Sequence, residues 1–139
     1  MEEKDLRQAL QVLESYKGQM ETLSRQINIL QVSLEESVRA RETLKVFASA
    51  KEGDEILVPI GASVFVAAKV TGSRKAVVGI GNRISVDKDL AEATEYMGSG
   101  VVEIQEALKK ASNAFSEMQS AANNLAEAIN AEYEARQQA

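Results

Sequence analysis

The chain has 139 residues, of which 27% are charged and 4% aromatic, and its net charge of -5 argues against a nucleic-acid binder, which normally needs a basic stripe. It has no Cys and no His, so disulfides, thiolate catalysis, His general bases and the usual zinc sites are excluded. No apolar run approaches the roughly 20 residues that span a bilayer, and the charged start MEEKDLRQAL has no signal-peptide core. We therefore expect one cytoplasmic domain, residues 1–139, that contacts neither membrane nor nucleic acid.

Residues 1–52 have the pattern of a long coiled-coil helix. Alternate steps of three and four residues, from Leu6 to Leu44, meet an apolar side chain at ten of twelve positions. The average step of 3.5 residues is the seam of a left-handed coiled coil. We expect four more apolar residues to widen this seam locally: Leu10, Ile29, Val32 and Val38. Gly53 is expected to end the helix.

Residues 54–86 are the one stretch with the composition of β-structure. β-Branched and aromatic side chains suit a pleated surface, and Pro, Gly and Asn fall where turns are needed. We expect four short strands, near 55–60, 62–70, 75–81 and 83–86. About 33 residues are too few to bury both faces of a sheet unaided, yet both faces are apolar.

Two interpretations of this β segment are open. In the first, its core is completed by another chain, and the interface residues are Val64, Val66, Val77, Val78 and Ile80. In the second, the two flanking helices fold back and cover it. The first is favoured because the apolar seams of the flanking helices match each other.

Residues 87–136 are predicted to form the second coiled-coil helix. Asp87 is the expected N-cap, and Asp89 and Glu92 lie in the predicted first turn, where negative charge suits the helix dipole. Steps of three and four residues from Leu90 to Glu132 follow a second, largely apolar seam. Gly98 and Gly100 each weaken the helix by about 1 kcal/mol relative to Ala, and they mark a bend or a close helix crossing.

Two seams of equal length predict an antiparallel hairpin. The matching register pairs Leu44 with Leu90, Ile27 with Leu108, Met20 with Phe115 and Leu6 with Ile129. We expect an α+β, mainly α fold: a long antiparallel coiled-coil hairpin with two β-hairpins inserted between the helices. Each helix would be about 60–70 Å long, with the β segment at one end and both termini at the other. The alternative, a four-helix bundle, is disfavoured by seams longer than about five heptads.

Candidate catalytic and cofactor sites are weak. Gly79-Ile80-Gly81 follows a predicted strand, but the third Gly and the helix of a dinucleotide fingerprint are missing, so a turn explains it better. Helix capping explains Asp87 and Asp89 without a metal. The other acidic residues are dispersed over helical outer faces. We predict that the protein is not an enzyme and binds no cofactor or metal.

The apolar seams continue to the predicted open end of the hairpin. Six apolar residues lie there: Leu6, Leu10, Leu13, Leu125, Ile129 and Tyr133. Exposed apolar surface on a soluble protein commonly marks an interaction site. The alternative is that these residues only close the coiled coil.

Two segments resemble the β segment of the alpha class of archaeal prefoldin subunits. They are ILVPIGASVFVAAKV, with its Val58-Pro59-Ile60-Gly61 turn, and KAVVGIGNRISVDKDLAEA, with its Val78-Gly79-Ile80-Gly81 strand end. The resemblance covers essentially the whole chain. Its four strands point to the alpha class, because beta-class subunits have a single hairpin. The β motif is fairly specific, whereas the heptads are common to many proteins.

This resemblance implies a hetero-hexamer of two alpha-class and four beta-class subunits, whose β segments form a double-barrel platform carrying six coiled coils. It also implies an ATP-independent holdase that captures unfolded client proteins at the coiled-coil tips and delivers them to a group II chaperonin. A scaffold or tether that binds one fixed partner is a second class of function, and it would not protect unrelated unfolded proteins. A catalytic domain is the third.

Overall fold

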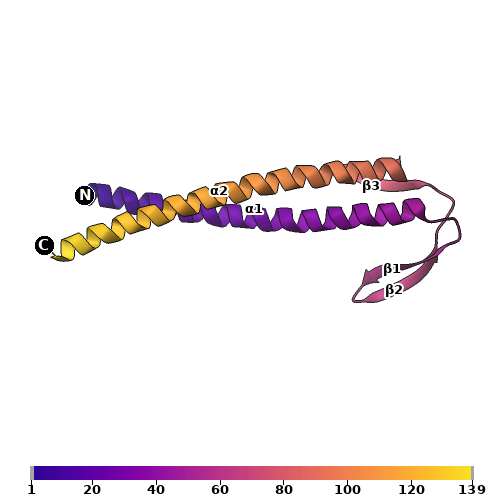
Figure 1. Ribbon diagram of the computed structural model, residues 1–139, viewed down its shortest axis with the longest axis horizontal. Helices are drawn as coiled ribbons and strands as arrows, with labels where there is room; N and C mark the ends of the chain where they lie inside the picture. Colours follow the sequence, from indigo (N-terminus) through magenta and orange to yellow (C-terminus); the bar gives the residue numbers. More distant parts are fainter. Residues whose placement is uncertain (1, 139) are drawn as a thin grey trace. The chain divides into compact units, whose positions relative to one another are not determined.

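The structure, a computed structural model, describes residues 2–138 and contains two helices and four strands (Figure 1). Helix α1 spans Glu3–Ser49 and helix α2 spans Leu90–Gln138. Between them lie β1 (Glu55–Gly61), β2 (Val64–Lys69), β3 (Lys75–Gly81) and β4 (Ile84–Asp89). The predicted order of helix, two hairpins and helix is confirmed. Residues 1 and 139 of the predicted domain lie outside the described residues.

The chain divides into two compact units. Unit 1 comprises the residues up to Ser33 together with those from Ile104 onward, so it holds the first part of α1 and the last part of α2. Unit 2 comprises Leu34–Glu103 and holds the rest of both helices and all four strands.

The seam predicted in each helix is the less exposed face of that helix. In unit 1 Leu6 and Ile129 are buried, with 3% and 4% of their surfaces exposed, and in unit 2 Val101 is buried. The other seam positions between them are half-buried at the predicted intervals of three and four residues, except Ala111 and Ala122, which are buried. The expected widening of the α1 seam is wrong, because the four residues concerned are exposed, between 38% and 69%: Leu10, Ile29, Val32 and Val38.

The sequence of the first hairpin is repeated in the second, 20 residues further along the chain. Val58 of the first hairpin corresponds to Val78 of the second, and Val66 corresponds to Val86. Each forms its own two-stranded antiparallel sheet, with Val58 opposite Val66 in one and Val78 opposite Val86 in the other. In both, the register shifts just before a glycine, Gly61 or Gly81, whose φ is near +108°.

The same two-residue turn then follows in each hairpin. Ala62 and Ser63 have φ of 51° and 61°, and Asn82 and Arg83 have 50° and 61°. Two successive positive φ values define the type I′ turn, whose twist matches that of the flanking strands. Both hairpins therefore fold by the same local rules.

The N-cap predicted at Asp87 is wrong, because β4 continues to Asp89 and α2 begins only at Leu90. Lys75 pairs with Asp89 at the end of the ladder, and opposite charges on facing residues stabilise a strand pair. The Leu90 N–H then donates to the Arg74 carbonyl at 2.9 Å. Pairing with β3 thus outweighs the local capping preference of Asp87.

The end of the first helix was predicted at Gly53, but α1 ends earlier, at Ser49. No basic residue stands in the last turn of α1. Arg74 supplies one from between the hairpins: its guanidinium donates to the Ala50 carbonyl at 3.0 Å and also to the Ala48 carbonyl. A cation that hydrogen-bonds the last carbonyls stabilises a helix C-terminus. Arg74 therefore joins the end of α1 to the start of α2.

Gly98 makes room for a side chain of the facing helix in unit 2. A Cβ placed on Gly98 would lie 3.3 Å from Arg41 Nε, which is closer than ordinary contacts. That nitrogen is buried and has no hydrogen-bond partner among residues 2–138. Of the two interpretations of the α2 glycines, a close helix approach is therefore the one that the structure supports at Gly98.

Candidate interaction surfaces

The β segment presents apolar side chains that the rest of the chain does not cover. Of the five residues predicted for a subunit interface, Val64, Val66, Val77 and Ile80 are exposed, from 47% for Ile80 to 74% for Val77, and Val78 is half-buried. Leu57, Ile60 and Phe65 are also more than half exposed. The alternative in which the flanking helices cover this segment does not describe the structure.

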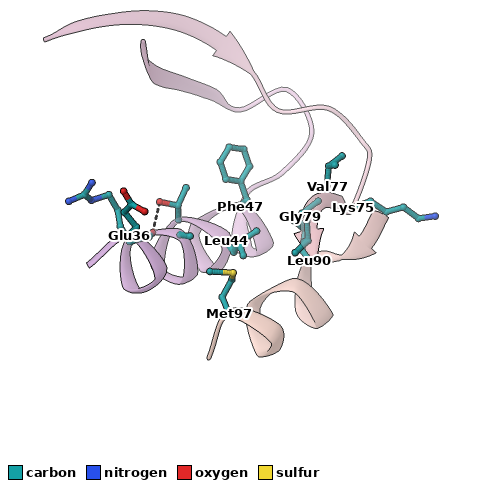
Figure 2. Close-up of a pocket in the computed structure, with 13 residues that line it drawn as sticks. Glu36, Leu44, Phe47, Lys75, Val77, Gly79, Leu90 and Met97 are labelled. Carbon is teal, nitrogen blue, oxygen red and sulfur yellow. Dashed lines mark hydrogen bonds between the residues drawn. The ribbon is translucent and has the colours of Figure 1, made fainter. Parts of the chain in front are cut away.

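A groove of about 700 Å³ lies beside β3 in unit 2 (Figure 2). Leu44 and Phe47 line it from α1, Leu90 and Met97 line it from α2, and five consecutive strand residues, 75–79, line it from β3. Leu44 and Leu90 share this groove, as the predicted helix register requires. Its walls are mostly apolar, although the charged side chains of Glu36, Arg39 and Lys75 also line it.

The open-end residues, all in unit 1, divide into a buried and an exposed set. Leu6 and Ile129 are buried in the seam, and Leu13 and Leu125 are half-buried. Leu10 and Tyr133 are exposed, at 38% and 44%. Burial in the seam fits a role of Leu6 and Ile129 in closing the coiled coil, while Leu10 and Tyr133 leave apolar surface exposed.

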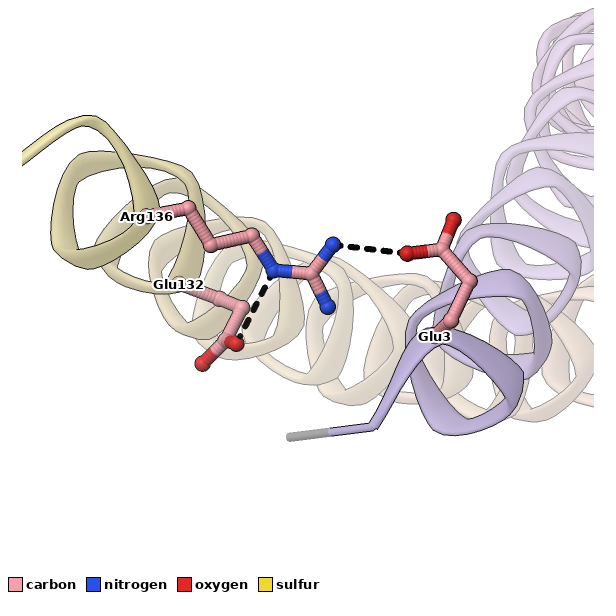
Figure 3. A network of polar contacts seen from close by, with 3 residues as sticks. All are labelled: Glu3, Glu132 and Arg136. Atoms are coloured by element: carbon pink, nitrogen blue, oxygen red, sulfur yellow. Dashed lines mark hydrogen bonds and ion pairs between the residues drawn. The ribbon is translucent and has the colours of Figure 1, made fainter. Parts of the chain in front are cut away.

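An ion pair joins the two helices where the chain termini lie in unit 1 (Figure 3). Arg136 Nη1 donates to Glu3 Oε2 at 2.8 Å, and Arg136 Nε donates to Glu132 Oε1 at 3.2 Å. The hydrogen bond and positive charge of Arg136 lower the pKa of Glu3 below its usual range. The pair was not predicted from the sequence, because Glu3 and Arg136 are far apart along the chain.

This ion pair predicts a pH dependence at the open end. A carboxyl whose pKa is lowered by folding adds stability above its unfolded-state pKa, and that stability is lost as the pH falls through the folded-state pKa. Because Glu3 is fully exposed, the effect is small and screened by salt. We expect amide exchange in residues 3–8 and 132–136 to accelerate below about pH 4 relative to mid-helix amides. Glu3→Gln should show the fast exchange already at pH 7, and unchanged exchange in that variant would contradict the role of the pair.

Within residues 2–138 no group of three or more acidic side chains is placed to hold a metal ion. An apolar stretch able to cross a bilayer occurs in neither described helix.

Arg74 is the residue of structural importance that sequence reasoning missed. Two signals pointed to it: α1 has no basic residue in its last turn, and the 20-residue repeat aligns Arg74 with Asp54. Both residues accept an N–H at a hairpin base, Asp54 from Val70 and Arg74 from Leu90, each at 2.9 Å.

Comparison with known proteins gives consistent matches. A family model described as "Prefoldin subunit" matches residues 16–135. The chain is 32% identical over 108 residues to prefoldin subunit alpha of Methanothrix thermoacetophila, covering 78% of this chain and 71% of that protein. It is 29% identical to prefoldin subunit alpha of Archaeoglobus fulgidus, covering 98% and 96%. The solved filamentous PFD of Methanocaldococcus jannaschii superposes with a TM-score of 0.67 at 26% identity, covering 87% of this chain and 98% of that one.

Proposed function

Because the chain belongs to the prefoldin family, as an alpha-class subunit, we propose that it works as one prefoldin-like domain in a hexameric holdase with beta-class partners. The observation that carries the assembly is the exposed apolar β segment, with Val77 exposed at 74%. A lone soluble protein rarely exposes so large an apolar patch, and two-stranded sheets leave unpaired strand edges that favour pairing with another chain.

In the proposed complex, two copies of this chain and four beta-class subunits contribute their hairpins to a β-barrel platform. Partner strands would cover Val64, Val66, Val77 and Ile80, and partner side chains would fill the groove beside β3. The two hairpins share their register and turn, so each can meet a partner strand in the same way. Burial of these side chains supplies the association free energy.

Clients would be captured where the helices end in unit 1, chiefly by Leu10 and Tyr133, with Leu6, Leu13, Leu125 and Ile129 holding the seam. Non-native chains expose apolar side chains that otherwise aggregate. Several weak apolar contacts on separate arms add up through effective concentration, so each stays individually reversible. Release to a group II chaperonin in the cytoplasm then needs no ATP.

The test of this function is light scattering from a denatured client diluted into the hexamer without nucleotide. The intact complex should suppress aggregation of several unrelated clients. Suppression of none of them, by a complex of correct mass, would favour a scaffold that binds one fixed partner.

Replacing Leu10 and Tyr133 together by Ser should reduce protection while the hexamer mass stays unchanged. The lost apolar area corresponds to at most a few kcal/mol per arm at about 25 cal/mol/Å². Beta-class arms would retain part of the activity, more for large clients that reach several arms. Val38→Ser is a matched control, because Val38 is similarly exposed at 41% but lies in unit 2. Equal protection by the double variant and the control would exclude Leu10 and Tyr133 as a client site.

A further inference from the structure

Strands β2 and β3 follow each other in the chain but do not pair. β2 ends at Lys69 and β3 begins at Lys75, so a short connection, residues 70–74, lies between them. Consecutive antiparallel strands with so short a connection commonly form a hairpin. In this structure β2 pairs with β1 and β3 pairs with β4, in two separate sheets. Within residues 2–138 the other edges of β2 and β3 are therefore free of strand partners.

The backbone of both edges is arranged to pair. The Val70 N–H donates to the Asp54 carbonyl, and the Leu90 N–H donates to the Arg74 carbonyl, each at 2.9 Å. These bonds mark hydrogen-bonded pairs at the hairpin bases, and such pairs alternate with non-bonded pairs along an antiparallel ladder. By this alternation, three N–H groups of each strand point away from its own partner strand: those of Phe65, Ala67 and Lys69 in β2, and those of Lys75, Val77 and Gly79 in β3. The two edges could therefore form a regular ladder with each other.

A ladder between β2 and β3 would be favourable at all but one of its pairs. With residues 70–74 as the loop, the facing pairs would be Phe65 with Gly79, Ala67 with Val77, and Lys69 with Lys75. An aromatic residue beside glycine and a pair of apolar residues stabilise strand pairing. Two like charges directly opposite each other destabilise it. The lysine pair beside the loop is thus the pair that opposes closure.

The charges of these two lysines are not taken up by ion pairs. Within residues 2–138 neither lysine has a carboxylate partner in an ion pair, although the registers place Glu55 opposite Lys69 and Asp89 opposite Lys75. Both lysines line one hollow of about 290 Å³ together with Arg74, and none of its described lining residues is acidic. A closed sheet of four strands would carry a row of charges in the order negative, positive, positive, negative. Its two inner strands would still repel each other.

We infer that Lys69 and Lys75 keep the edges of β2 and β3 from closing on each other, so that both edges stay free for strands of partner subunits. The second part of this inference rests on the proposed assembly. Pairing within the chain and pairing with a partner use the same backbone groups, so the two compete. Repulsion at this one position lowers the population of the closed sheet without covering either edge.

Disulfide trapping in the isolated chain measures closure. The parent chain has no Cys, so Ala67→Cys with Val77→Cys reports a facing pair of the closed sheet. Glu55→Lys with Lys69→Glu exchanges the charges of the first hairpin, which keeps its facing pair and the net charge but presents a carboxylate to Lys75. After this exchange the intrachain disulfide should form about fivefold faster at low salt, the factor given by about 1 kcal/mol. At about 1 M salt the difference should largely disappear.

A second charge exchange is the matched control. Lys75→Asp with Asp89→Lys, added to the first exchange, again places like charges on the two edges, so the disulfide rate should return close to that of the parent charges. Misfolding would be reversed neither by two further substitutions nor by salt. Equal rates for the parent charges and the first exchange would overturn the inference, as would a rate that stays high after the second exchange. These measurements need no partner, so they do not depend on the holdase function.

Assembly with beta-class partners tests the second part, in chains without the Cys pair. The first exchange should lower the yield of hexamer, and the second exchange should restore most of it. Equal yields from all three chains, despite different disulfide rates, would overturn the role of the free edges in assembly and leave the proposed function intact. Failure of the parent chain itself to assemble would instead overturn the proposed function.

Discussion

Val77→Asp is expected to abolish assembly with beta-class partners while the helical circular dichroism signal survives. Val77 is 74% exposed in the chain alone, so a carboxylate there costs the isolated subunit little. Covered by a partner strand, the same carboxylate would be desolvated without a counter-charge, which costs several kcal/mol per site. Each weakening of about 1.4 kcal/mol lowers the association constant tenfold. Sedimentation velocity of the mixed subunits measures the loss directly.

The position of this substitution follows from the structure. Val78 is half-buried beside the groove, so charging it would disturb folding and assembly together. Because Val77 is exposed in the chain alone, a charge there should disturb assembly without disturbing folding. Val32→Asp is the control, since it places the same charge on an exposed valine of α1 in unit 1. A Val77→Asp chain that still assembles to full mass would show that β3 is not in the interface.

Arg74→Ala should destabilise unit 2 by about 1–2 kcal/mol, because the last carbonyls of α1 lose a charged hydrogen-bond donor. For a chain of this size that corresponds to a lower Tm of about 2–6 °C. The same change should speed amide exchange at Leu90, whose N–H is held by the Arg74 carbonyl. Thermal melts of the assembled complex and hydrogen exchange of residues 46–50, at and just after the end of α1, provide the measurements.

Two further variants make this prediction specific. Arg83→Ala removes the same charge from the second hairpin turn, and its melt should stay close to that of the parent chain. Arg74→Lys keeps the charge but loses the planar guanidinium that reaches two carbonyls. Its Tm should therefore lie between that of the parent chain and that of Arg74→Ala. If Arg74→Ala and Arg83→Ala melt alike, the capping role assigned to Arg74 is wrong.

The sequence predicted the element order because each element has a strong period of its own. Heptads fixed the seams of both helices, and β-branched residues with well-placed glycines fixed four strands. The start of α2 was missed because a local rule, the capping preference of Asp87, was outweighed by pairing of residues 87–89 with β3. Helix ends depend on such tertiary competition, which a single stretch of sequence does not display.

Surface assignments were less predictable for a geometric reason. A heptad shows which residues face the seam, but not how far the facing helix covers the residues beside it. Leu10 and Ile29 were therefore expected to widen the seam, although the facing helix leaves both exposed. Leu6 and Ile129 look as available as Leu10 and Tyr133 in the sequence, yet the structure buries both of them in unit 1. Small residues stand at every seventh position of α2, from Ala93 to Ala135, so Ala107 and Ala114, which line a hollow beside the seam, did carry a periodic signal.

The most direct test of the central claim is the native mass of this chain, measured alone and after mixing with a beta-class prefoldin subunit. The exposed apolar face of its hairpins, with Val77 at its most open position, should draw the mixture into one six-chain complex containing two copies of this chain. A mixture in which the two proteins keep their separate masses, or in which this chain associates only with itself, would contradict the assembly on which the proposed function depends.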